Sequence, residues 1–227
     1  MIVLKNIEEE IKQHKLFLES ELTNTLNTIN APKVLKNVMT YSVLSGGKRI
    51  RPFILSEIAK LYDVNPKVYK YPGMAIEMVH CFSLIYDDLP CMDDDDMRRG
   101  KPTVHIKFNE ENALLGGASL LVFSYQLLAS KNFKVSDNIK NILIEDFSNA
   151  IGAEGMLAGQ FLDLEAEGKK FKLTLKKFRK IQEMKTSLLI ALCARTGAVL
   201  GGATKKEKDL LFEFGVILGR MFQIRDD

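Results

Sequence analysis

Apolar residues recur every three to four positions along most of the chain, which is the spacing of an amphipathic helix. Between about Ile7 and Leu26, for example, Ile11, Leu18 and Leu22 recur at helical spacing. Sustained alternation of apolar and polar residues is scarce, and the sequence contains no Asn-Gly hairpin signal. The pattern therefore predicts an all-α protein.

Glycine and proline divide this pattern into helices, because proline suits a first helical turn and glycine a helix end. The expected helices cover residues 7–26, 32 to the stop at 46–47, 52–61, 72–89, 109–129, 136–165, 173–200 and 206–227. The sequence shows no internal repeat, low-complexity tract or linker. We expect a single domain over residues 1–227, with side chains from facing helices building its site.

Composition narrows the function classes only a little. The net charge of +3, from 32 basic and 29 acidic residues, gives no general footprint for nucleic acid. Cys81, Cys91 and Cys193 lack paired or metal-type spacing, and charges appear early in residues 1–15, where a signal peptide would be apolar. These features predict a cytoplasmic protein.

One stretch, residues 112–130, carries no charged side chain. It includes Gly116, Gly117, Ser119, Ser124 and Gln126, so it is too polar for a lone membrane span. We expect a buried or subunit-interface helix there and no transmembrane segment.

The candidate chemistry is concentrated between His80 and His105. Six aspartates lie between Asp87 and Asp96, and Arg98, Arg99 and Lys101 follow them. Mg²⁺ prefers carboxylate and phosphate oxygens, and Arg binds the remaining phosphate oxygens. This arrangement favours a Mg²⁺–diphosphate site. A solvated acidic loop is the alternative, whereas a calcium loop would need a central Gly and a closing Glu that are missing here.

Pro90 gives the acidic stretch its expected geometry. Asp87 and Asp93 are six residues apart, so on a straight helix their side chains would point about 120° apart. Proline removes an N–H and disfavours a helical conformation of the residue before it. A break at Pro90 would allow both carboxylates to turn toward the same metal ions.

Five other groups of residues fit a phosphate or metal site, although each also has an ordinary structural explanation. The segment GGKRIRP at residues 46–52 places three cations around a turn before a helix, where a phosphate group is favoured. His80 lies two helical turns before Asp87, on the same face. The others are GQFLD at 159–163, Lys185-Thr186, and a second Asp pair, Asp226-Asp227.

Taken together, these segments resemble the trans-isoprenyl diphosphate synthases, and most closely the bacterial farnesyl diphosphate synthases. GGKRIRP, DDLPCMDDDDMRRGKPTVH, GQFLDL, KT and FQIRDD occur in the order found in that family. The resemblance implies an all-α bundle around a deep central cavity, usually as a homodimer. The implied reaction joins isopentenyl diphosphate to an allylic diphosphate (dimethylallyl or geranyl) with two to three Mg²⁺ ions, for which Mn²⁺ could substitute.

The family's site residues carry over onto matching positions of this sequence. The resemblance implies catalytic roles for Asp87, Asp93, Arg98 and Lys185. It implies metal binding by Asp87, Asp88, Asp93, Asp226 and Asp227, with Asp88 the weaker candidate of the first three. The isopentenyl diphosphate would be held by Lys48, Arg51, His80 and Arg99, and the allylic substrate by Arg98, Lys185, Thr186 and Gln223.

The resemblance also bears on product length. In the family, an aromatic residue five positions before the first Asp, with the two-residue insertion matched by Pro90-Cys91, points to a C15 product. Phe82 holds that position and Ser83 follows it, so we expect farnesyl diphosphate. A geranylgeranyl diphosphate synthase and a non-catalytic prenyl-synthase-like subunit or fragment remain alternatives. The family's second motif continues to a third Asp and further helices, which this sequence lacks after Asp227.

Overall fold

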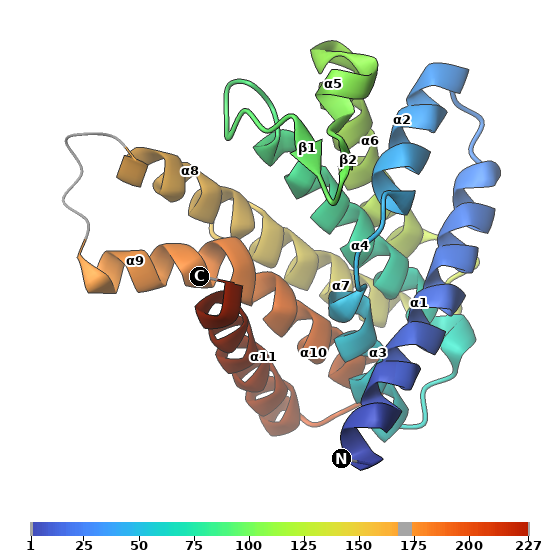
Figure 1. The fold of residues 1–227 in the computed structure, drawn as a ribbon. Coiled ribbons are helices and arrows are strands. Elements are labelled where there is room, and N and C mark those ends of the chain that lie inside the picture. Colours follow the sequence, from blue (N-terminus) through green and yellow to red (C-terminus); the bar gives the residue numbers. More distant parts are fainter. Residues whose placement is uncertain (1, 168–173, 227) are drawn as a thin grey trace. The chain divides into compact units, whose positions relative to one another are not determined.

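A computed structural model describes the backbone of residues 2–167 and 174–226, and the side chains of residues 6–166 and 174–223. Most of these residues lie in helices (Figure 1). The only strands in the described ranges are β1, Met97–Arg98, and β2, Lys101–Pro102. The all-α fold expected from the spacing of apolar residues is confirmed.

The chain divides into two compact units. Unit 1 comprises residues 1–53 and 70–130, and unit 2 comprises residues 54–69 and 131–227. Two helices contribute residues to both units: α3, Ile50–Leu61, and α4, Pro66–Asp87.

Unit 1 has a core formed by α1, Ile2–Asn27, α2, Lys33–Leu44, α4 and α6, Glu110–Ala129. The apolar face predicted for the first helix is buried, with Leu18 and Leu22 at most 1% exposed. Gly116 of α6 packs directly on Val38 of α2, where an added Cβ would overlap the valine side chain. A short helix, α5, Val104–Phe108, lies between β2 and α6 in the sequence.

Helix α6 is strongly apolar and has one exposed face. The helix is long and apolar enough to cross a membrane, and it is the only described helix that is. Leu115 and Val122 are more than half exposed although the opposite face of the helix is buried. These two residues line a shallow groove together with Ala118 and Ser119, at the spacing of one helical face.

Unit 2 is built around α10, Leu188–Leu200, most of which is buried. Its other helices are α7, Asp137–Ile151, α8, Met156–Glu167, α9, Leu175–Gln182, and α11, Lys205–Asp226. Helix α11 packs closely against α10 and the residue before it, because glycines of α11 lie at the contact. An added Cβ on Gly219 would stand 2.5 Å from the Cα of Ser187. An ion pair of 2.8 Å joins Arg195 of α10 to Asp146 of α7.

Several predicted boundaries were wrong. The helix expected over 136–165 is interrupted between Ile151 and Met156, where Gly152 and Gly155 lie. The helix expected over 173–200 contains a five-residue π-helical turn, Glu183–Ser187, between α9 and α10. The fourth helix starts at Pro66 and contains Pro72, because a buried proline can be tolerated inside a helix that tertiary packing holds.

Candidate active site

The end of α4 brings the first and last residues of the predicted aspartate motif together. The helix stops at Asp87, directly before the segment that contains Pro90. The chain then turns back, and the backbone N–H of Asp93 donates a 2.9 Å hydrogen bond to the carbonyl oxygen of Asp87. The N–H groups of Met92 and Asp94 both donate to Leu89, at 2.8 and 3.2 Å. The loop is therefore closed by its own backbone.

The side chains of this loop suit a metal that also takes ligands from a substrate. Asp93 is exposed and Asp87 is half-buried. Among the described side chains, no three carboxylate, imidazole or thiol groups come close enough together to hold a metal ion. Because Mg²⁺ usually takes one or two carboxylates and fills its shell with phosphate oxygens and water, a pair such as Asp87 and Asp93 fits its needs.

Asp88 faces a different partner. Its carboxylate is 3% exposed and accepts a 2.5 Å hydrogen bond from Nε of Arg98. Burial raises the pKa of Asp88, whereas the hydrogen bond and the charge of Arg98 act in the opposite direction. Arg98 also contacts Asp95, with 3.2 Å between Nη2 and Oδ2. Asp88 thus fixes the position of the arginine expected to bind the allylic diphosphate.

The two arginines lie on a β-hairpin that the sequence pattern did not reveal. Strands β1 and β2 pair antiparallel, with Arg98 opposite Lys101. The two residues between them, Arg99 and Gly100, have φ angles of +53° and +73°. Positive φ at both positions is typical of the tight turns that join paired strands, and the Arg-Gly sequence was the signal that could have been used.

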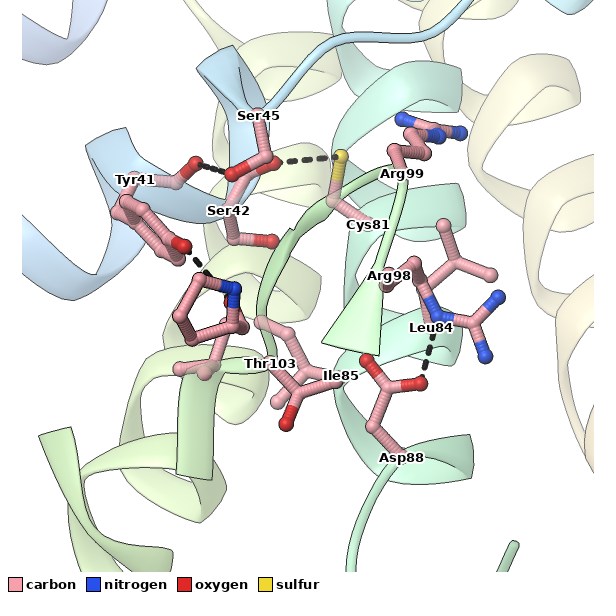
Figure 2. A pocket seen from close by; sticks show the side chains of 12 residues that line it. Tyr41, Ser42, Ser45, Cys81, Leu84, Ile85, Asp88, Arg98, Arg99 and Thr103 are labelled. Atoms are coloured by element: carbon pink, nitrogen blue, oxygen red, sulfur yellow. Dashed lines mark hydrogen bonds and ion pairs between the residues drawn. The ribbon is translucent and has the colours of Figure 1, made fainter. Parts of the chain in front are cut away.

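This hairpin packs on α2 and α4 (Figure 2). The hydroxyl of Tyr41 donates a 2.7 Å hydrogen bond to the carbonyl of Pro102. A cavity of about 30 Å³ remains between the hairpin and the two helices, lined by Ser42, Ser45, Cys81 and Asp88 among others. This space has room for only about one water molecule, so the hairpin packs closely against the two helices.

Arg99 links the hairpin to the basic loop at residues 46–51. Its Nη1 donates to the carbonyl oxygen of Gly46, and its guanidinium covers Gly47. An added Cβ on Gly47 would stand 2.6 Å from Nη1 of Arg99, and the φ of Gly47 is +117°. Only glycine suits that position.

The three cations of the basic loop have different environments. Lys48 is exposed, and Arg51 points toward His80, with 3.3 Å between Nη1 and Nε2. The sequence pattern placed three cations around this turn, and the family resemblance implied a phosphate site formed by Lys48 and Arg51. Arg49 instead is 3% exposed and its guanidinium is paired within unit 1, so two cations of the loop are left for such a site.

Phe82, the expected chain-length residue, is packed against a second ring. Phe82 is 3% exposed, and its ring centroid lies 4.7 Å from that of Tyr86, one turn along α4. The Tyr86 hydroxyl donates a 3.2 Å hydrogen bond to the carbonyl of Leu114 on α6. The hydroxyl of Ser83 donates to the carbonyl of His80 at 2.9 Å. The sequence reasoning did not single out Tyr86.

A second group of predicted residues lies in unit 2. Nζ of Lys185 is 2.7 Å from Oδ2 of Asp163, which joins the π-helical turn to α8. The side-chain amide of Gln223 on α11 donates to the hydroxyl of Thr186. Asp163, Lys185 and Thr186, which are weak candidates separately, therefore each have a polar partner: Asp163 pairs with Lys185, and Thr186 contacts Gln223. The side chains of Asp226 and Asp227 lie outside the described residues.

Comparisons with known proteins place the chain in a family. Residues 32–227 match the model of the polyprenyl synthetase family. The farnesyl diphosphate synthase of Geobacillus stearothermophilus is 40% identical over 223 residues, which are 98% of this chain and 74% of that protein. A chloroplastic geranylgeranyl pyrophosphate synthase of Capsicum annuum is 37% identical over 199 residues, 88% of this chain and 54% of that protein.

A solved structure supports the same assignment. The crystal structure of an FPP/GFPP synthase from Zymomonas mobilis has a TM-score of 0.92 and 34% identity, covering 100% of this chain and 81% of that one. The chain belongs to the polyprenyl synthetase family. It is a prenyltransferase with an all-α fold.

The environment of His80 yields a prediction about pH. Burial lowers the pKa of His80 well below its ordinary value, and the charges of Arg51, Arg99 and the other nearby arginines lower it further. Below about pH 6.5, the imidazole of His80 therefore binds a proton in the unfolded chain but stays neutral in the folded chain. The free energy of unfolding should fall on acidification below pH 6.5, by at most about 1.4 kcal/mol per pH unit for this site.

Urea unfolding of the protein and of His80→Gln between pH 7.5 and 5.5 measures this effect. The fall with pH should be smaller in His80→Gln, which keeps a polar side chain but does not titrate. An NMR titration in which the His80 ring signals shift with a midpoint near pH 6.5 would contradict the prediction.

Proposed function

We propose that the protein condenses isopentenyl diphosphate with an allylic diphosphate, dimethylallyl or geranyl, in a Mg²⁺-dependent reaction that yields farnesyl diphosphate. The observation that carries this proposal is the hydrogen bond from Asp93 N–H to the carbonyl of Asp87, which gathers the aspartate motif at the end of α4. The cations of the hairpin adjoin it through the Arg98–Asp88 pair. Relatives named as farnesyl diphosphate synthases support the assignment. We infer a cytoplasmic enzyme.

The metal would be held by the acidic residues at the end of α4. Asp87 and Asp93 would bind Mg²⁺, with Mn²⁺ as a substitute, and Asp226 and Asp227 would bind a further ion, giving two to three in all. Asp88 would contribute mainly through Arg98, because its carboxylate is buried against that side chain. Bound Mg²⁺ would stabilise negative charge on the departing diphosphate.

Each diphosphate would have its own set of side chains. Arg98 would bind the allylic diphosphate, helped by Lys185, Thr186 and Gln223. The isopentenyl diphosphate would be bound by Lys48, Arg51, Arg99 and His80. A neutral imidazole carries one N–H donor, so His80 would donate a hydrogen bond without adding charge.

The reaction requires charge separation in a dry site. The allylic C–O bond breaks, and fixed cations such as Arg98 stabilise the charge that builds on the diphosphate oxygen. The double bond of isopentenyl diphosphate then attacks the allylic carbon, and loss of a proton forms the new double bond. Apolar side chains around the acidic stretch would keep water from the reactive carbon.

Geranylgeranyl diphosphate is the second candidate product, because relatives with that activity in their names match nearly as well. The buried ring of Phe82 favours the shorter product, since an aromatic side chain would limit the depth available to a growing prenyl chain.

The acidic loop provides the first functional test. With Mg²⁺, isopentenyl diphosphate and geranyl diphosphate, the protein should form a longer prenyl diphosphate that mass spectrometry identifies, and EDTA should abolish the reaction. Asp93→Asn should lower kcat by about 10²-fold or more, because a metal ligand loses its charge. Asp94→Asn is the matched control: Asp94 is an exposed neighbour with φ of +53°, which Asn tolerates equally well. Equal activity of the two variants would refute the metal assignment.

The ring of Phe82 provides a test of product length. Phe82→Ala should shift the product beyond C15, because removal of the ring deepens the space beside α4. The substitution should also destabilise the fold by about 3–5 kcal/mol. Leu22→Ala, which removes a buried side chain from α1, controls for that loss and should leave product length unchanged. A C15 product from Phe82→Ala would show that the ring does not set the length.

We also propose a homodimer in which α6 meets a second copy of the chain. The exposed face of α6 is apolar and lacks charge over residues 112–130, which is typical of surfaces buried between identical subunits. Val122→Lys should yield a species of 25.6 kDa in sedimentation experiments where the unaltered chain has twice that mass. Leu16→Lys, at an exposed leucine of α1, is the control and should remain dimeric. A dimer that survives Val122→Lys would place the contact elsewhere.

A further inference from the structure

Arg49 lies in the middle of the basic loop but points into unit 1. Its Nη1 donates a 2.6 Å hydrogen bond to Oε1 of Glu77 on α4. Its Nη2 lies 3.0 Å from Oε1 of Glu19 on α1 and donates at 2.6 Å to the carbonyl oxygen of Val43 on α2. One side chain of the loop is therefore bonded to three helices.

A charged group in this position has to be matched by its partners. Arg49 and Glu77 are both at most 3% exposed, whereas the side chain of Glu19 is 27% exposed. Guanidinium is charged at every relevant pH and presents donors in a fixed planar fork, so its contacts specify an orientation as well as a distance. An apolar side chain could fill the same volume, but it would not fix the orientation of the loop.

The backbone at Arg49 transfers this orientation to its neighbours. Its φ angle is +54°, and its carbonyl oxygen accepts a 3.0 Å hydrogen bond from the N–H of Phe53. That bond belongs to the first turn of α3, which carries Arg51 toward His80. Lys48, on the other side of Arg49, is exposed. Because Arg49 points inward, the exposed Lys48 on one side of it is separated from Arg51, which faces His80.

We propose that Arg49 is a positioning residue which, through Glu19 and Glu77, sets the directions of Lys48 and Arg51 for binding isopentenyl diphosphate. This inference rests on the proposed function, because the binding roles of Lys48 and Arg51 belong to it. The allylic substrate is bound by other side chains, so a disturbance of Arg49 affects the two substrates unequally.

The test uses substitutions that weaken the triad of Arg49, Glu19 and Glu77 but keep a polar side chain at each position. Glu19→Gln removes the charge of the partly exposed partner, and Arg49→Lys keeps a cation but loses the planar fork. Both variants should raise the KM for isopentenyl diphosphate by about tenfold, whereas the KM for geranyl diphosphate stays within about twofold, since tenfold corresponds to the loss of about one good hydrogen bond. Glu21→Gln is the matched control, because Glu21 also lies on α1 and forms a 2.8 Å ion pair, with Lys70, at similar exposure.

Calorimetric titration of isopentenyl diphosphate separates this inference from the proposed function. If the unaltered protein binds the substrate and Glu19→Gln and Arg49→Lys bind it equally well, the positioning role is overturned while the proposed function stands. Equal losses for both substrates, or equal losses in Glu21→Gln, would mark the triad as a general support of the fold and would also overturn the inference. If the unaltered protein binds no isopentenyl diphosphate, the proposed function fails and the positioning role fails with it.

Discussion

The hydrogen bond between the N–H of Asp93 and the carbonyl of Asp87 is the constraint on which the candidate site depends. A continuous helix would direct the two side chains about 120° apart. Proline at position 90 cannot extend the helical hydrogen bonding, so the backbone groups freed at the end of α4 find new partners within the loop. The main chain therefore brings the backbones of Asp87 and Asp93 together, where a continuous helix would keep them almost two turns apart.

The cations around this loop are already engaged by the protein itself. Arg98 pairs with Asp88, Arg99 bonds to the carbonyl of Gly46, and Arg51 faces His80. These contacts hold long side chains in place before a ligand arrives, which reduces the entropy lost on binding. A diphosphate must compete with these partners, but only Asp88 among them is a charged group that is deeply buried. Arg98 is thus the most firmly positioned of the three.

The sequence predicted the helical fold because apolar spacing reports burial, and it predicted the end of α4 because proline acts locally. It missed the β1–β2 hairpin, in which Arg99 and Gly100 form the turn. Each strand has only two residues, which is too short to give a pattern of alternating apolar and polar positions. It also treated residues 136–165 as one helix, since apolar periodicity continues across the break between α7 and α8. The inward direction of Arg49 was beyond sequence reasoning altogether, because it depends on carboxylates contributed by α1 and α4.

Product length illustrates the same limit for specificity. A residue at one sequence position, Phe82, suggested where a prenyl chain would stop. In the structure its ring packs on Tyr86, whose hydroxyl is bonded to α6. Tyr86 can lie there only because α6 carries Gly117, where an added Cβ would stand 2.6 Å from the tyrosine ring. Close-packed rings cannot shift independently. The depth of the space beside Phe82 therefore depends on the packing of α4 against α6, so a glycine 35 positions away in the sequence limits what one aromatic residue can specify.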